Sequence, residues 1–171
     1  RHSWSKSPAS PMSATVDPDA AALLIDGLSV RSFGRDDGIP VLFSAGLGGS
    51  GAYWRAQIDA FGPSYRIITY DHRGTGQSSR DTLGLPYHVE DMAADLALVL
   101  DGLGIDAAHV VGHAAGGVAA LSLATTAPDR LLSITVVNGW AKPDPHFARC
   151  MAIRRDIYLS HGVEGYLRAQ P

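Results

Sequence analysis

The sequence predicts an α/β fold, in which a mostly parallel sheet is covered by helices on both faces. Short apolar runs such as PVLFSAG and YRIITYD end at glycine or at a polar loop, which is typical of strands buried on both sides. Stretches of helical length separate these runs, so strand and helix alternate from about residue 40 to residue 139. With 171 residues, 46% of them hydrophobic, the chain is long enough for one domain with a substantial core.

The individual elements follow from local patterns. Residues 23–34, LLIDGLSVRSFG, alternate apolar and polar positions around Gly27 and predict a short antiparallel pair of strands. From Val89 to Leu103 apolar residues recur at helical spacing, and glycines close the helix. Further strands are expected at 40–46, 65–71, 108–113 and 131–139, and further helices at 52–61, 114–127 and 146–158.

Three parts are expected along the chain. Residues 1–22 are rich in Ser, Pro and Ala and lack the apolar segment of a secretory signal, so they predict a disordered tail. Residues 23–140 predict the first part of an α/β core. Residues 141–171, which include a polar helix with several arginines, predict the start of a helical lid.

Composition argues against several classes of partner. The formal net charge is −3 and no block of Lys or Arg occurs, so nucleic acid and anionic membrane surfaces are poor partners. No apolar run approaches the roughly 18 residues that cross a bilayer. The single cysteine, Cys150, fits a reducing cytosol. We therefore expect a cytoplasmic protein that binds a small molecule and uses no cofactor or metal; the sequence leaves a homodimer open.

The turn GHAAGG, which begins at Gly112, joins a predicted strand to a predicted helix. In the pattern Gly-X-Ser-X-Gly, a turn of this kind presents a nucleophilic serine, and its central residue is forced towards positive φ. Gly112 and Gly116 are the small neighbours that such an elbow needs, but its central residue is Ala114. A generic glycine-rich turn is the plainer alternative. A dinucleotide-binding loop is disfavoured because GHAAGG is not Gly-X-Gly-X-X-Gly.

Two further loops follow predicted strands. In SAGLGGSGAYW the position of Leu47 predicts a backbone amide that would pair with the amide of Ala115 to form an oxyanion hole, although a tight turn without a ligand is an alternative. Tyr53 and Trp54 either line the mouth of the pocket or fix the following helix to the sheet.

The loop YDHRGTGQS is expected to be structural. Its Asp, Arg and Gly residues predict a network of charge-assisted hydrogen bonds, and His72 with one neighbouring carboxylate is too small a set for a metal site. His113 is expected to be a packed histidine whose side chain points away from Ala114. The residues expected to lock this loop are Asp71, Arg73, Gly74 and Gly76.

Together these motifs resemble the α/β-hydrolase superfamily across residues 23–139. Read with VNGW and ARCMAIRRDIYLSHGVEGYLRAQP, they resemble more closely the aminoacrylate (or carbamate) hydrolases of bacterial pyrimidine utilisation. In that family the elbow also reads Gly-His-Ala-X-Gly, so Ala114 matches the family pattern.

The resemblance implies an enzyme of uracil catabolism that hydrolyses 3-aminoacrylate to malonic semialdehyde and ammonia, or hydrolyses carbamate. It implies Ala114 at the elbow and the Leu47 and Ala115 amides as oxyanion donors. The substrate pocket is expected to be lined by Gly46, Gly48, Tyr53, Trp54, His113, Asn138 and Trp140. In α/β-hydrolases the catalytic acid and histidine lie on later strands, so we expect the 171-residue chain alone to be inactive.

A mechanism without a serine nucleophile is compatible with these substrates. Adding water to an imine and expelling ammonia needs proton transfer and charge stabilisation, and it needs no acyl-enzyme. Two alternatives stay open. One is a serine ester or amide hydrolase, or an enol-lactonase, whose nucleophile has been replaced by Ala114. The other is a non-catalytic ligand-binding protein on the same scaffold.

Overall fold

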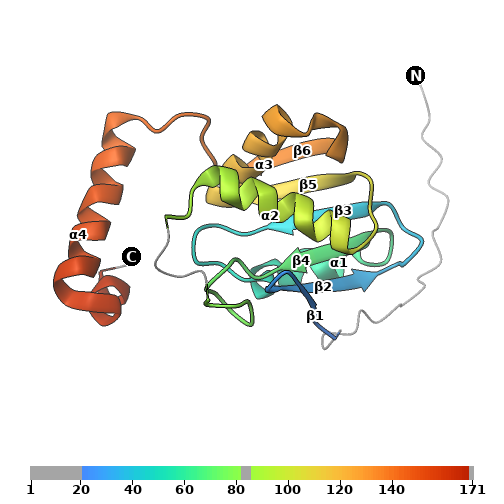
Figure 1. Cartoon of the computed structure of the whole chain (residues 1–171), viewed down its shortest axis with the longest axis horizontal. Helices are drawn as coiled ribbons and strands as arrows, with labels where there is room; N and C mark the ends of the chain where they lie inside the picture. The colour runs from blue at the N-terminus through green and yellow to red at the C-terminus, as the bar shows by residue number, and fades with distance from the viewer. Residues whose placement is uncertain (1–20, 82–85, 170–171) are drawn as a thin grey trace, which may run out of the picture. The chain divides into compact units, whose positions relative to one another are not determined.

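The computed structural model describes residues 21–81 and 86–169, and these form two units that meet in sequence at Gly139 and Trp140. The first unit contains a six-stranded sheet with the order β1-β2-β4-β3-β5-β6 (Figure 1). Strands β4, β3, β5 and β6 are parallel to one another, whereas β1 and β2 are antiparallel additions at one edge. The predicted α/β fold with a mostly parallel sheet is therefore confirmed. The strands are β1 (Leu23–Ile25), β2 (Leu28–Gly34), β3 (Pro40–Ser44), β4 (Arg66–Tyr70), β5 (Ala108–His113) and β6 (Leu131–Val137).

Helices cover the two faces of the sheet unequally. On one face α2 (Val89–Gly102) and α3 (Ala115–Thr126) lie side by side, and α1 (Arg55–Phe61) lies on the other (Figure 1). The short helices η1 (Gly51–Trp54) and η2 (Pro128–Arg130) precede α1 and β6. The prediction of one helix over 52–61 thus becomes a 3-10 turn followed by a short α-helix.

Two hydrophobic cores result from the alternation of side chains along each strand. In β3, Leu42 faces the larger core with α2 and α3, while Val41 and Phe43 face the smaller core with Trp54 and Ile58. The larger core is closed by the apolar stripe of α2, which the helical spacing predicts. Residues of β6 contribute little to either core, because this strand forms the edge of the sheet and is mostly exposed.

The second unit consists mainly of α4 (Pro145–Arg168). Asp144 caps this helix by accepting a hydrogen bond from the Phe147 amide at 2.7 Å. The predicted end at residue 158 is wrong: the helix continues for ten more residues through a kink at Gly162, where φ is 66°. Beyond the kink, Glu164 and Arg168 form an i, i+4 ion pair that supports the last turn. A lid function for this unit stays a prediction.

The predicted disordered tail falls almost entirely on residues outside the described ranges. Within residues 21–81 and 86–169, no helix combines the length and the apolar character that a bilayer crossing requires.

Candidate active site

The turn between β5 and α3 has the geometry of a strained elbow. Ala114 has φ 49° and ψ −118°, in the left-handed region that L-residues rarely adopt. Such a backbone costs about 1–3 kcal/mol and persists only where its surroundings hold it. The Ala114 amide donates to the Val137 carbonyl at 2.9 Å, and the Ala114 carbonyl accepts from the Gly117 amide at 3.0 Å. The backbone is therefore as sharp here as the sequence predicts, and the role of Ala114 as an elbow position stays a prediction.

Close backbone contacts explain the glycines on both sides of Ala114. A Cβ atom on Gly112 would lie 2.5 Å from the carbonyl carbon of Gly116. A Cβ atom on Gly116 would lie 2.4 Å from the carbonyl oxygens of Ser44 and Ala45, at the end of β3. Because these are backbone atoms, they cannot move aside, and only glycine allows the elbow to pack this tightly against β3.

The loop after β3 reaches the elbow at Gly46. A Cβ atom on this glycine would lie 3.4 Å from the Ala114 methyl group, so the loop and the elbow border the same small space. The loop turns through a hydrogen bond from the Gly49 amide to the Gly46 carbonyl, with Gly48 at φ 73°. The side chain of Leu47 is exposed to solvent.

Two backbone amides near this space are the predicted oxyanion donors. Among the described residues, neither the Leu47 amide nor the Ala115 amide has a hydrogen-bond acceptor. The Ala115 amide belongs to the first turn of α3, where unpaired N–H groups and the helix dipole favour negative charge. Both amides follow directly on Gly46 and Ala114, which border the same small space. An oxyanion hole formed by these two amides stays a prediction.

The loop after β4 is locked by hydrogen bonds from charged and polar side chains, as predicted. The buried Asp71 carboxylate accepts hydrogen bonds from the amides of Gly51 at 2.8 Å and Gln77 at 2.9 Å, and so ties two loops together. His72 donates from Nε2 to the Ala45 carbonyl at 2.9 Å, next to Gly46. Burial lowers the pKa of His72, against the opposing effects of that hydrogen bond and of the nearby carboxylates. Arg73 continues the network to α2, where its Nε lies 2.9 Å from Asp95.

In the part of the chain that the structure describes, no three His, Cys, Asp or Glu side chains gather as metal ligands. The hydrogen bonds of Asp71 and His72 go to backbone groups of the loops.

The two aromatic residues of η1 divide the roles that the sequence left open. Trp54 is 4% exposed and packs on Phe43 with ring centroids 4.8 Å apart, so it fixes η1 to the sheet. Tyr53 is 56% exposed and stacks on His113 at 5.1 Å. Tyr53 therefore lies at the rim of the elbow, whereas Trp54 is buried against the sheet.

The expectation that His113 points away from Ala114 is wrong. A Cβ atom on Gly46 would lie 3.2 Å from His113 Nδ1 and 3.4 Å from the Ala114 methyl group. Both side chains thus border the same glycine. Side chains alternate along a regular strand, but the positive φ at Ala114 breaks that alternation at the end of β5.

The remaining two predicted pocket residues lie after β6. Asn138 is exposed, with φ 51°, immediately after the strand that holds the Ala114 amide. Trp140 belongs to the second unit, where its ring packs on Phe147 at 4.3 Å. A role for either residue in the pocket stays a prediction.

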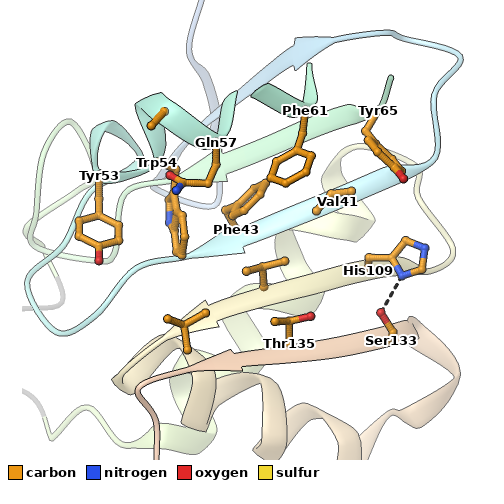
Figure 2. A pocket seen from close by; sticks show the side chains of 13 residues that line it. Val41, Phe43, Tyr53, Trp54, Gln57, Phe61, Tyr65, His109, Ser133 and Thr135 are labelled. Atoms are coloured by element: carbon orange, nitrogen blue, oxygen red, sulfur yellow. Dashed lines mark hydrogen bonds between the residues drawn. The ribbon is translucent and has the colours of Figure 1, made fainter. Parts of the chain in front are cut away.

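A cavity of about 730 Å³ lies on the face of the sheet that carries α1, and sequence reasoning missed it (Figure 2). Phe43, Phe61 and Tyr65 form one side, while residues of β5 and β6 form the other. His109 and Ser133 form a hydrogen bond of 2.7 Å at one end, and Tyr53 lies at the other. No local pattern in the sequence marks this cavity, because the cover of a sheet face depends on which helices pack against it in the folded protein.

Comparisons with known proteins agree with this geometry. Residues 39–169 match the family model described as alpha/beta hydrolase fold. A protein of Caulobacter segnis named "Putative carbamate hydrolase RutD" is 52% identical over 131 residues, which are 77% of this chain and 49% of that protein. A protein with the same name from Azorhizobium caulinodans is 49% identical over 134 residues, or 78% of this chain and 50% of that protein. The chain thus spans about half the length of these relatives.

Solved structures give the same result. A hydrolase from Pseudomonas aeruginosa is 27% identical, with a TM-score of 0.73 over 91% of this chain and 64% of that one. Rv0554 from Mycobacterium tuberculosis is 32% identical, with a TM-score of 0.71 over 78% of this chain and 48% of that one. With its strained elbow, its sheet order and the match over residues 39–169, the chain belongs to the alpha/beta hydrolase fold family.

Proposed function

We propose that this chain carries the elbow and oxyanion amides of a hydrolase that releases ammonia from a small carboxylate, either carbamate or 3-aminoacrylate. The observation that carries the proposal is Ala114, which has the strained backbone of a nucleophile elbow and a methyl group in place of a nucleophile. The similarity to proteins named carbamate hydrolase supports the choice of substrate class. The setting we propose is uracil catabolism in the cytoplasm.

The chemistry of these substrates fits a site without a nucleophile. Carbamate takes up one proton on nitrogen, its C–N bond breaks, and ammonia and carbon dioxide leave. 3-Aminoacrylate is protonated on carbon to give an iminium ion, and water adds to the iminium carbon. A proton then passes from the added oxygen to nitrogen, ammonia leaves, and loss of the last proton gives malonic semialdehyde. Neither route forms a bond to the enzyme. Proton transfer by positioned groups contributes typically 10²–10⁴-fold, which suits substrates that already decay in water.

In this proposal the protein supplies charge stabilisation and shape. The amides of Leu47 and Ala115 donate hydrogen bonds to an oxygen of the substrate carboxylate, in the manner of an oxyanion hole. A side chain larger than alanine would fill the space above the Ala114 methyl group. With alanine, this space holds the substrate or its attacking water. The rim is formed by Tyr53 and His113, with Gly46 and Gly48 leaving room for the ligand.

The test is ammonia release from both substrates by the full-length protein, compared with its Ala114→Ser variant. We expect the protein with Ala114 to accelerate release and the variant to bring no large gain. A many-fold higher turnover of 3-aminoacrylate in Ala114→Ser would show that a nucleophile-free route is wrong.

The same variant separates the alternatives. If Ala114→Ser gains esterase activity and labelling by a fluorophosphonate, the chain descends from a serine hydrolase whose nucleophile was replaced. Saturable binding with no turnover in either form would identify a ligand-binding protein instead.

A further inference from the structure

Beside the elbow, His113 has a nitrogen that the protein leaves without a partner. Its Nδ1 is buried and has no hydrogen bond among the described residues. The atom lies against Gly46: a Cβ atom placed on this glycine would be only 3.2 Å from it. Nothing in the supporting network that holds Asp71 and His72 reaches it.

The ring of His113 cannot easily turn to find a partner. It stacks on Tyr53 with centroids 5.1 Å apart and planes 23° from parallel. Tyr53 in turn meets the buried Trp54 edge-on at 5.0 Å. The backbone of His113 is fixed as well, because it pairs with Val137 in the parallel ladder of β5 and β6. The ring therefore keeps one orientation relative to Gly46 and Ala114.

This orientation decides which nitrogen carries the proton in the neutral ring. A proton on Nδ1 would bury an N–H group without an acceptor, which is rarer and more costly than an acceptor left without a donor. The proton therefore resides on Nε2, on the side of the ring away from the buried Nδ1. Nε2 itself has no hydrogen bond to a described residue, so its N–H is available to a ligand.

We propose that His113 is a substrate-binding residue whose Nε2–H donates a hydrogen bond to the carboxylate of the substrate. The inference rests on the proposed function, because a carboxylate is common to carbamate and 3-aminoacrylate. It assigns the two oxygens of the substrate carboxylate: the Leu47 and Ala115 amides face one oxygen, and His113 holds the other. The carboxylate of 3-aminoacrylate does not react, so its contact with His113 is made equally in the ground and transition states, and such a contact raises affinity and leaves turnover unchanged.

The first test reads the ring directly and needs no turnover. In 15N-labelled protein we expect the neutral His113 ring to carry its proton on Nε2. Acrylate should shift the Nε2–H resonance, whereas acrylamide, which has the same shape without the charge, should shift it much less. A proton on Nδ1, no shift with acrylate, or equal shifts with both compounds would overturn the inference.

The second test uses three substitutions at one position in the full-length enzyme. His113→Phe keeps the stack on Tyr53 and loses the donor, so KM should rise about tenfold or more, as expected for a hydrogen bond to a charged group, with kcat within about twofold. His113→Gln places an amide N–H near the Nε2 position and should restore most of the affinity. His113→Asn places its amide at the Nδ1 position and should not.

A matched control and the overturning outcomes complete this test. His88→Asn removes an exposed histidine at the start of α2, and asparagine caps a helix well, so its KM should stay unchanged. An unchanged KM in His113→Phe, or an effect confined to kcat, contradicts the inference. If neither substrate is turned over, the proposed function fails, while the acrylate titration still decides the role of His113.

Discussion

His72, the buried histidine that supports the loop after β3, differs from His113 at the rim of the elbow because its Nε2 already has a hydrogen-bond partner in the protein. His72 is 3% exposed and donates from Nε2 to the Ala45 carbonyl, so its neutral form holds the loop after β3 in place. Protonation would place a charge in the core beside this loop. Burial therefore lowers the pKa of His72 below its ordinary value.

A pH dependence of stability follows from His72. In the unfolded chain its pKa is about 6.5, and in the native protein it is lower, so the unfolded state binds more protons between the two values. The contribution of His72 to the free energy of unfolding should therefore be at its full value above pH 6.5. It should decline as the pH falls from 6.5 towards the native pKa. We expect urea midpoints measured from pH 7.5 to pH 5 to show this decline.

The variant His72→Gln keeps a donor for the Ala45 carbonyl and loses the titration, so its urea midpoint should change less over this range. The exposed His88→Asn should retain the full decline. Equal declines in His72→Gln and in the unaltered protein would show that other groups cause the effect.

At the scale of elements, the buried carboxylate of Asp95 connects α2 with the loop after β4 and, through Arg73, with the turn between β1 and β2. Asp95 of α2 is 2% exposed and lies 2.8 Å from the Arg73 guanidinium, which follows β4. Arg73 also reaches Asp26 between β1 and β2 at 3.1 Å, and the Tyr87 hydroxyl donates to Asp95. The pairing of α2 with the loop after β4 thus depends on this charge.

Removing the charge of Asp95 should destabilise the protein strongly. Asp95→Asn leaves the Arg73 guanidinium without its buried partner, and breaking a buried pair costs about 3–5 kcal/mol. Asp26→Asn removes the other partner, whose side chain is 68% exposed, and should cost less than about 1 kcal/mol. Asparagine also tolerates the positive φ of 46° at that position, so the comparison isolates the charge. Urea unfolding of both variants measures the difference, and equal losses would refute the central role of Asp95.

At the scale of the first unit, no described strand pairs with the outer edge of β6. Strand β6 follows β5 as the last strand, and Leu132, Val136 and Val137 are 53%, 37% and 43% exposed. The cavity on the α1 face runs along the same strand (Figure 2). Parallel sheets are ordinarily buried on both faces, so this chain presents apolar surface and unpaired strand groups together.

We expect the 171-residue chain to self-associate through this edge. The double substitution Leu132→Lys and Thr135→Lys places charge on both faces of β6 and should reduce association, as lysine does on natural edge strands. Ile39→Lys removes a hydrophobic side chain of equal exposure, 53%, ahead of β3 and should leave association unchanged. Sedimentation at several concentrations measures the effect. A monomeric chain, or equal loss of association in both variants, would contradict the expectation.

Much of the fold could be predicted from the sequence because its signals are local. Apolar runs bounded by glycine locate the strands, and the stripe from Val89 locates α2. The far end of α4 could not be predicted, since Gly162 interrupts the helix without ending it. At the site, the elbow at Ala114 was predictable because its neighbouring glycines are determined by steric contact within a few residues.

By itself the sequence determined the succession of strands and helices along the chain and the sharp turn at Ala114, which has no serine at its centre. It also determined the hydrogen-bond network of the loop around Asp71. Only the tertiary structure decided that the His113 and Ala114 side chains border the same glycine, that Trp54 is buried while Tyr53 is exposed, and that one face of the sheet carries a cavity. The reason is physical. Glycine requirements and apolar periodicity act between neighbours in sequence, whereas the direction of a side chain beside a strained residue and the cover of a sheet face depend on segments that meet only in the folded protein.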